Sequence, residues 1–308
     1  MKLLLYLPSK ELPAWRAAFA AALPQAEVRV WEKDLEWRAD YVALWQPPGD
    51  ILKHQTQLKA AFNLGAGVEA LLRSVTLPPN VPLIRLEDAG MGRQMVEYVT
   101  WAVLRYFRRL DGYAAQQSRF EWRPHRPLRH AEFPVGVMGI GVLGAQVARA
   151  LAALAFPVVG WSLSEKQIDG VRCFVGRAEL DGFLGAARVL VCVLPHTADT
   201  EGLLDHDTLA KLPRDSYVIN VGRGGLIVDE DLLAFLDSGH IAGATLDVFD
   251  QEPLPASHPY WRHPKVCVTP HIAADTLIEE AVAQVAEKIR RIERSEAVTG
   301  VVDRTRGY

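Results

Sequence analysis

The sequence predicts an α/β protein of two domains, each organised around a mainly parallel sheet. Short apolar runs alternate with longer helical patterns from end to end, which is typical of repeated β-α-β units. The 308 residues suffice for one large or two ordinary domains, since a domain has about 100 to 200 residues. A long helical pattern near residue 100 separates two alternating regions and favours two domains.

A small α/β domain is predicted in the first third of the chain. Its candidate strands are residues 2–7, 27–31, 41–45, 61–64 and 82–85. Between the first two strands we expect Ser9 to cap a helix. Leu12, Trp15 and Phe19 recur there at a spacing that gives the helix one buried face.

A single long helix is predicted over residues 91–110, which contain no proline and carry apolar side chains on one common side. Such a helix suits a domain boundary. We therefore expect a first domain of residues 1–95 together with 277–308, closed by the C-terminal helix. Residues 96–276 form the second, larger domain.

The segment 116–133 should be irregular and exposed, because it combines several Arg and His residues with Trp122 and two prolines. A basic stretch with aromatic residues is compatible with nucleic acid binding. A connector or subunit contact is the preferred interpretation, since the whole chain carries a formal net charge of −3.

The second domain continues the alternation from Pro134 onward. Its candidate strands are residues 135–138, 157–160, 172–174, 189–194, 217–220, 244–248 and 266–269. A final helix is predicted over residues 275–294, where apolar side chains recur at helical spacing.

Composition excludes several classes of protein. The near balance of 34 basic and 37 acidic residues gives no basic field for nucleic acid or anionic membranes. Three cysteines without paired spacing indicate neither a disulfide framework nor a metal site. The first residues are too short for a signal-peptide core, and no apolar run is long enough to span a membrane. We expect a soluble cytoplasmic protein that binds small molecules.

A dinucleotide site is predicted at a glycine motif. Gly139, Gly141 and Gly144 form G-I-G-V-L-G, with Val142 and Leu143 between them, directly after an apolar strand and before an Ala-rich helix. This order provides a tight turn, close backbone approach to a pyrophosphate and a helix N-terminus facing the anion. It indicates a Rossmann-type doubly wound sheet, although a glycine-rich turn in an ordinary α/β protein is the alternative.

The end of the next strand favours NADP(H) over NAD(H). About twenty residues after the glycines, where an acidic side chain would bind the ribose of NAD, the chain has Trp161 and Ser162. No carboxylate there repels a 2′-phosphate, and Ser162, Ser164 and Lys166 can bind one. No Arg is present in this segment, so NAD(H) remains possible.

Three further segments follow predicted strands of the second domain: N-V-G-R-G-G around Arg223, D-V-F-D-Q-E-P around Glu252 and T-P-H-I-A around His271. The carboxyl ends of parallel strands share one sheet edge, where open α/β folds bind their ligands. Each residue alone has an ordinary reading, as a turn arginine, a solvated acid or a histidine at a helix start.

Taken together, these motifs resemble those of the D-isomer-specific 2-hydroxyacid dehydrogenase family, in the same order and over nearly the whole chain. The resemblance implies a flavodoxin-like substrate domain beside the coenzyme domain, with Arg223 binding substrate, Glu252 as its acid partner and His271 transferring a proton. The segments A-D-Y-V-A-L-W-Q-P-P and G-M-G-R-Q-M-V-E-Y are most similar to the branch that reduces glyoxylate and hydroxypyruvate.

The chemistry of these three side chains agrees with reduction of a 2-keto acid. Arg223 offers a planar guanidinium that matches a carboxylate and stays charged. His271 can donate or accept a proton near neutral pH. A carboxylate from Glu252 on the other ring nitrogen stabilises the imidazolium, which favours the reductive direction.

In the first domain, N-L-G-A-G-V-E-A-L-L resembles the family's loop whose backbone amides bind the substrate carboxylate. Ala66 and Gly67 are the expected positions, because small residues let the backbone approach an anion. The resemblance places Trp45 at the substrate, where it leaves room only for a small one. A turn at a helix start and a core tryptophan are the alternatives.

The resemblance also assigns residues that line the cofactor. Beyond the glycine motif, Trp161, Ser162, Ser164, Lys166 and His271, they are Leu163, Leu194, Pro195, Val221, Gly222 and Asp247. Leu163 stands where this branch usually has an arginine, which weakens the expectation of a strong NADP preference.

Two other functions stay open. The family includes corepressors that use the fold as a dinucleotide-sensing interaction module. Related enzymes of similar fold act on other substrates, such as phosphoglycerate or formate, but Glu252 disfavours formate and no extra basic residues indicate phosphoglycerate. The resemblance further implies a homodimer formed through the coenzyme domain.

Overall fold

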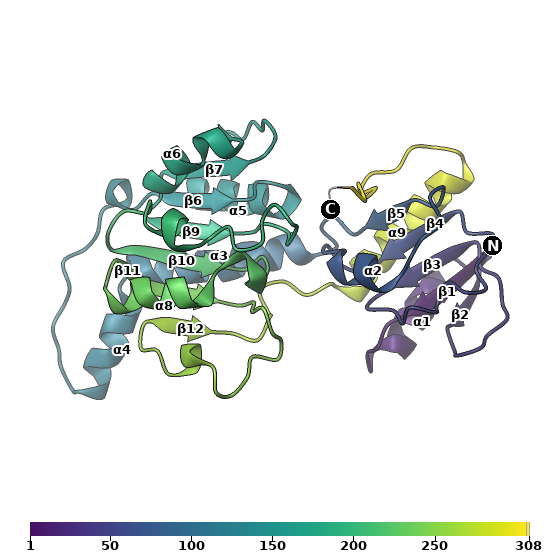
Figure 1. Cartoon of the computed structure of the whole chain (residues 1–308), viewed down its shortest axis with the longest axis horizontal. Helices are drawn as coiled ribbons and strands as arrows, with labels where there is room; N and C mark the ends of the chain where they lie inside the picture. Colours follow the sequence, from purple (N-terminus) through teal and green to yellow (C-terminus); the bar gives the residue numbers. More distant parts are fainter. Residues whose placement is uncertain (306, 308) are drawn as a thin grey trace. The chain divides into compact units, whose positions relative to one another are not determined.

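The computed structural model describes residues 1–305 and 307, which form two compact units (Figure 1). Unit 1 consists of Met1–Met91 and the described residues from Thr276 onward, and unit 2 consists of Gly92–Asp275. The sequence boundaries at 95/96 and 276/277 therefore lie four residues and one residue later than those of the structure. Each unit is described by itself below.

Unit 1 is built on a five-stranded parallel sheet with strand order β2-β1-β3-β4-β5. Its strands are β1 (Lys2–Tyr6), β2 (Glu27–Val30), β3 (Tyr41–Leu44), β4 (Ala60–Asn63) and β5 (Leu83–Arg85). Its helices are α1 (Leu12–Ala22), α2 (Glu69–Ser74) and α9 (Ile278–Glu293). Every residue of β3 and β4 is buried, which explains why all of them except Asn63, at the end of β4, are apolar or aromatic.

The C-terminal helix belongs to unit 1, as the sequence predicts. In Figure 1, α9 is the yellow helix of this unit, and it packs against α1. Its buried face contains Val282, Val285 and Ile289, which recur at helical spacing. The helix begins at Ile278 and ends at Glu293, slightly inside the predicted range of 275–294.

Helix α1 starts later than expected. Its N-cap is Glu11 rather than Ser9, and Pro13 lies in the first turn, where a missing N–H costs no hydrogen bond. The Ser9 hydroxyl instead accepts a hydrogen bond of 3.1 Å from the Glu11 N–H, just before the helix. The predicted buried face is present, with Trp15 and Phe19 in the core.

The predicted helix over 91–110 is two helices. Helix α3 (Met91–Phe107) ends before α4 (Leu110–Ser118), because Arg109 adopts a left-handed conformation with φ 54°. Sequence patterning does not reveal this break, since Arg is an ordinary helix former.

Unit 2 contains a seven-stranded parallel sheet with order β12-β11-β10-β9-β6-β7-β8. Its strands are β6 (Val135–Met138), β7 (Val158–Ser162), β8 (Val171–Val175), β9 (Val189–Cys192), β10 (Ser216–Asn220), β11 (Ile241–Leu246) and β12 (Val266–Val268). The order reverses at β6, between β9 and β7, which is the doubly wound arrangement of a Rossmann-type domain. The predicted α/β fold class is confirmed.

Short helices connect the strands of this sheet. They are α5 (Val142–Ala153), α6 (Leu180–Gly185), α7 (His206–Leu209) and α8 (Asp229–Asp237), with 3₁₀ turns η1 (His130–Glu132), η2 (Arg177–Glu179), η3 (Gly224–Leu226) and η4 (Pro259–Trp261). The largest boundary error is in β11, which begins at Ile241 instead of 244 because it pairs with β10 from Ser216 onward.

The excursion over 116–133 is exposed in its middle but not at its ends. Phe120 and Trp122 are 99% and 97% exposed, and residues 121–129 form no helix or strand. Gln116, by contrast, is buried within α4, where its side-chain amide lies 3.0 Å from His125 Nε2. Phe133 is fully buried in the core of unit 2.

Candidate active site

The three residues that carry the predicted chemistry follow adjacent strands of unit 2. Arg223 follows β10, Glu252 follows β11 and His271 follows β12. These strands are parallel neighbours, so the loops that leave them emerge at one edge of the sheet. The structure thus places all three at the carboxyl edge.

Glu252 and His271 are in direct contact. The Glu252 Oε2 lies 2.7 Å from His271 Nδ1, and both side chains are well exposed. The other carboxylate oxygen accepts a hydrogen bond of 2.9 Å from the Phe249 N–H, which holds Glu252 to its own loop. A carboxylate on Nδ1 selects the tautomer with a proton on that nitrogen and leaves Nε2 to exchange protons.

The loop of His271 is anchored on Asp247, a wholly buried residue of unit 2. The Asp247 carbonyl accepts a hydrogen bond of 2.8 Å from the His271 N–H. Its carboxylate accepts three more, from the Thr269 hydroxyl at 2.5 Å and the N–H groups of Ile272 and Ala273 at 2.9 and 2.8 Å. These bonds hold His271 at a positive φ of 56°, so the Asp247 carboxylate shapes the loop.

Tyr98 extends this anchor from helix α3. Its hydroxyl lies 2.5 Å from the Thr269 hydroxyl, and because Thr269 donates to Asp247, Tyr98 is the donor to Thr269. Burial raises the pKa of Tyr98, which keeps the phenol protonated. Tyr98 ends the segment G-M-G-R-Q-M-V-E-Y and Thr269 opens T-P-H-I-A, but the sequence assigns neither a role, because 171 positions separate them and no local pattern links them.

Asn220 shapes the loop that presents Arg223. This buried residue ends β10, and its side-chain amide donates a hydrogen bond of 2.9 Å to the Arg223 carbonyl. Its Oδ1 accepts one of 3.1 Å from the Gly222 N–H. A Cβ at Gly224 would lie 1.8 Å from the carbonyl carbon of Phe249, so only glycine lets the Arg223 loop pack on the loop that holds Glu252.

The glycine motif forms a turn that suits an anion. Gly139 has a φ of 101°, and a Cβ at Gly144 would lie 1.9 Å from the Gly139 carbonyl oxygen. A Cβ at Gly141 would have open space around it, and no side chain caps α5 at this residue. The N–H groups of the first turn, including those of Val142 and Leu143, are available to a phosphate. The residues present therefore fit a dinucleotide.

The other predicted cofactor residues lie around this turn with different exposures. Leu194 and Pro195 follow β9, and a Cβ at Gly139 would lie 3.1 Å from Leu194, so the two loops are adjacent. Val221 is buried, and Gly222 lies against the Leu194 backbone.

Trp161 and Ser162 end β7 but differ in surroundings. The Trp161 indole is buried in the core and donates a hydrogen bond of 2.9 Å to the Gly176 carbonyl, so only its backbone lies at the sheet edge. The Ser162 hydroxyl donates one of 2.6 Å to the Ser164 carbonyl. Residues 163–166, which include Leu163 and Lys166, are exposed.

In unit 1, Trp45 lies directly on the loop that the sequence singles out. A Cβ at Gly65 would be 2.3 Å from Cζ3 of the Trp45 indole, so the ring covers this glycine. Trp45 is half-buried, and Ala66 and Gly67 are partly exposed. The structure thus brings the three predicted substrate residues of unit 1 together.

Asn63 holds the loop of residues 64–67 through hydrogen bonds to its carbonyl groups. It is buried at the end of β4, and its side-chain amide donates hydrogen bonds to the carbonyls of Gly65 at 2.9 Å and Gly67 at 2.8 Å. In a trans peptide the N–H points opposite to the C=O, so the Ala66 N–H faces away from Asn63. Sequence reasoning did not single out Asn63, although it opens the same N-L-G-A-G segment.

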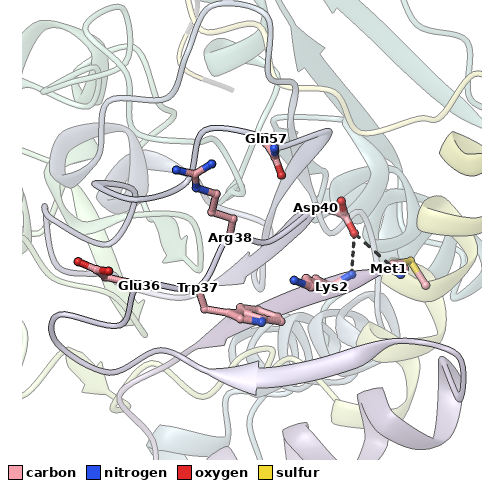
Figure 2. Close-up of a pocket in the computed structure, with 7 residues that line it drawn as sticks. All are labelled: Met1, Lys2, Glu36, Trp37, Arg38, Asp40 and Gln57. Atoms are coloured by element: carbon pink, nitrogen blue, oxygen red, sulfur yellow. Dashed lines mark hydrogen bonds and ion pairs between the residues drawn. The ribbon is translucent and has the colours of Figure 1, made fainter.

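A separate cavity of about 450 Å³ lies at the opposite, amino edge of the unit 1 sheet. Figure 2 shows Lys2, Trp37 and Asp40 on its wall, with Asp40 bound to the backbone N–H of Lys2 at 2.7 Å. Its lining contains none of the predicted site residues.

Within residues 1–305 and 307, no helix has the length and apolarity to cross a membrane, and no group of three or more His, Cys, Asp or Glu side chains is arranged for a metal.

Fold and site together define a dinucleotide-binding Rossmann-type protein with a paired carboxylate and histidine. Residues 100–273 match the family model described as D-isomer specific 2-hydroxyacid dehydrogenase, NAD binding domain. The chain belongs to this family, which confirms the resemblance seen in the sequence. Over the full length of both chains, it is 45% identical to glyoxylate/hydroxypyruvate reductase A of Yersinia enterocolitica and 47% identical to that of Klebsiella pneumoniae.

Solved structures agree. A D-isomer specific 2-hydroxyacid dehydrogenase from Xanthobacter autotrophicus, in complex with NADPH and MES, matches with a TM-score of 0.95 and 40% identity. An NADPH-dependent glyoxylate/hydroxypyruvate reductase from Sinorhizobium meliloti, in complex with NADP and sulfate, matches with a TM-score of 0.92 and 38% identity. Each match covers 100% of this chain and 99% of the other.

Proposed function

We propose that this protein reduces a small 2-keto acid, glyoxylate or hydroxypyruvate, to the 2-hydroxy acid with NADPH. The observation that carries the proposal is the 2.7 Å contact between Glu252 and His271, at the same sheet edge as Arg223 and the glycine turn. Full-length relatives at 45–47% identity bear the name glyoxylate/hydroxypyruvate reductase A, and similar structures hold NADPH or NADP. NADH is the second possible donor.

The glycine turn and the first turn of α5 would hold the pyrophosphate of the cofactor. When bound, NADPH supplies the hydride that reduces the carbonyl carbon. Leu194 borders the same turn, and Gly222 lies against Leu194. Together with their neighbours Pro195 and Val221, they would line the nucleotide. Asp247 supports this site through the His271 loop, because its carboxylate is fully engaged there.

Arg223 orients the substrate in this proposal. Its guanidinium binds the carboxylate and polarises the carbonyl oxygen, two tasks that a fixed planar cation performs well. In unit 1, the N–H groups of Ala66 and Gly67 are the donors that we expect to bind a carboxylate. Asn63 supports these donors by holding the loop carbonyls on its far side.

His271 completes the reaction by proton transfer. Its Nε2 donates a proton to the oxygen that develops negative charge as the carbonyl is reduced. Glu252 contacts Nδ1 and so orients the ring for transfer. The Trp45 indole, which covers Gly65, restricts the space beside the loop to a small substrate.

Initial rates with purified protein test the proposal. NADPH and NADH oxidation would be followed in parallel with glyoxylate, hydroxypyruvate, pyruvate and phosphohydroxypyruvate. We expect NADPH with glyoxylate or hydroxypyruvate to exceed the other pairs at least about tenfold. A preference for phosphohydroxypyruvate would assign another substrate. NADPH binding without turnover of any acid would favour the dinucleotide-sensing module.

We also propose a homodimer formed through the excursion of unit 2. Phe120 and Trp122 are almost wholly exposed, although such large aromatic side chains usually find partners. The contact between Gln116 and His125 anchors the base of the excursion, so it presents these rings from an ordered support. A second copy of the chain would cover them.

Sedimentation velocity tests this interface. The double variant Phe120→Ser, Trp122→Ser should sediment as a monomer at micromolar concentrations where the wild type is a dimer. Trp261→Ser, which alters another half-exposed tryptophan of unit 2, is the matched control and should leave the dimer intact. A monomeric wild type would refute the dimer.

The three cysteines are all free, so we place the protein in a reducing compartment, the cytoplasm.

A further inference from the structure

Arg177 lies beside residues 162–166, the segment expected to bind the ribose end of the cofactor. It belongs to none of the motifs predicted from the sequence, because it follows the next strand, β8. Strand β8 pairs with β7, with Val175 opposite Ser162. The Gly176 N–H donates a hydrogen bond of 2.9 Å to the Ser162 carbonyl. Arg177 follows at once, so its backbone sits at the carboxyl edge next to Ser162.

The Arg177 side chain is exposed and reaches toward the loop beyond β9. Its Nη2 donates a hydrogen bond of 2.7 Å to the Asp199 carbonyl and lies 3.8 Å from the Asp199 carboxylate. Asp199 follows Leu194 and Pro195 in this loop. Because β6 and β7 lie between β9 and β8 in the sheet, the contact joins segments from either side of the β6–β7 pair.

This position matches the place where a Rossmann-type fold distinguishes its two cofactors. The ribose 2′-position lies at the end of the second strand, and a nearby arginine accommodates the phosphate of NADP. We propose that Arg177 binds the 2′-phosphate of NADPH. It supplies the arginine that residues 162–166 lack, but from the neighbouring strand.

The present partner of Arg177 does not oppose this role. Both Arg177 and Asp199 are more than half exposed, and such ion pairs contribute little, so a phosphate can compete for the guanidinium. A phosphate also accepts two parallel hydrogen bonds from arginine, which the Asp199 carbonyl cannot. The Asp199 carboxylate is a nearby like charge for the phosphate, so its removal should strengthen NADPH binding.

Calorimetric titration of the full chain tests the assignment, which rests on the proposed use of NADPH. Wild type, Arg177→Ala, Asp199→Asn and Arg172→Ala would each be titrated with NADPH, NADH and 2′,5′-ADP. Arg172 is exposed at the opposite end of β8 and serves as a matched loss of one positive charge. We expect Arg177→Ala to weaken NADPH and 2′,5′-ADP about tenfold to a hundredfold and NADH less than about twofold.

The remaining variants sharpen the result. Asp199→Asn should bind NADPH a few times more tightly and NADH unchanged, and Arg172→Ala should match wild type. If Arg177→Ala weakened binding of NADPH and NADH equally, or weakened neither, the role of Arg177 would be overturned, but not the proposed use of NADPH. A wild type that does not prefer NADPH would overturn the proposed NADPH dependence as well.

Discussion

In each unit, an asparagine at the end of a strand holds the loop that follows it, but the two loops carry different functional groups. Unit 1 has N-L-G-A-G at residues 63–67, and unit 2 has N-V-G-R-G at residues 220–224. In both, a buried asparagine ends a parallel strand and donates its side-chain amide to carbonyls of the following loop. The fourth position is Ala66 in one and Arg223 in the other. A shared scaffold thus exposes backbone amides in unit 1 and a guanidinium in unit 2.

The loops differ in what packs on them. In unit 1 the Trp45 indole covers Gly65, so a side chain limits the space at the loop. In unit 2 backbone packs on backbone, because a Cβ at Gly222 would lie 2.7 Å from the Leu194 carbonyl oxygen. The unit 2 loop is therefore fixed by main chain, whereas that of unit 1 can be altered through one side chain.

The largest expected effect is the loss of the guanidinium that distinguishes the second loop. Arg223→Ala should lower kcat/KM for glyoxylate by roughly a thousandfold, because it removes the charged donor that we propose binds the carboxylate and the reacting oxygen. Steady-state kinetics measure this, and calorimetry should give an NADPH Kd close to wild type. Arg223→Lys should recover only part of the activity, since an ammonium cannot bind bidentately. Wild-type rates in the alanine variant would refute the catalytic assignment.

The proposed proton donor, His271, belongs to unit 2, so His271→Gln should lower kcat without changing the loop of unit 1. We expect kcat to fall by about a hundredfold, at the lower end of the range for general acid catalysis. Single-turnover rates with saturating NADPH measure the chemical step directly. Glu252→Gln should lie between this variant and wild type, because it keeps the contact with Nδ1 but removes the charge. A His271→Gln variant as fast as wild type would exclude this histidine as the proton donor.

Replacing Asn63 or Asn220 tests whether the strand-end asparagine stabilises its loop equally in both units. Asn63→Ala and Asn220→Ala should each lower the free energy of unfolding by about 1 to 3 kcal/mol, because buried carbonyls lose their donor. Asn63→Ala should also raise KM for glyoxylate several-fold with little change in kcat, whereas Asn220→Ala should lower kcat by displacing Arg223.

Urea unfolding and steady-state kinetics separate these effects. Asn80→Ala removes an exposed asparagine of unit 1 and should change neither stability nor KM. If Asn63→Ala loses stability but keeps its KM, the loop of unit 1 does not bind the substrate carboxylate.

The smallest expected effect is that of replacing Trp45, whose indole packs on the loop of unit 1. Trp45→Phe should raise relative activity toward larger 2-keto acids by a few-fold, since a smaller ring leaves more space over Gly65. Rates with glyoxylate and with a branched 2-keto acid, compared as a ratio, measure this change. Trp15→Phe, a core substitution elsewhere in unit 1, should leave the ratio unchanged.

Much of the architecture could be predicted from sequence because its signals are local. Alternating apolar runs predict the parallel sheets, and the glycine motif predicts the Rossmann-type domain. The failures also have local causes. Arg109 breaks the predicted 91–110 helix through a conformation that its residue type does not reveal, and Pro13 moves the start of α1 past Ser9.

The sequence by itself determined which residue types follow the strands and so reach the carboxyl edges of the sheets, because the order of strands and motifs along the chain is read directly from it. Only the tertiary structure decided which partners those residues meet. The contacts of Tyr98 with Thr269, and of Arg177 with Asp199, join positions that no short-range pattern relates. Such contacts depend on how strands and helices pack in three dimensions, so the sequence predicts neither the anchoring of the His271 loop by Asp247 nor the position of Arg177.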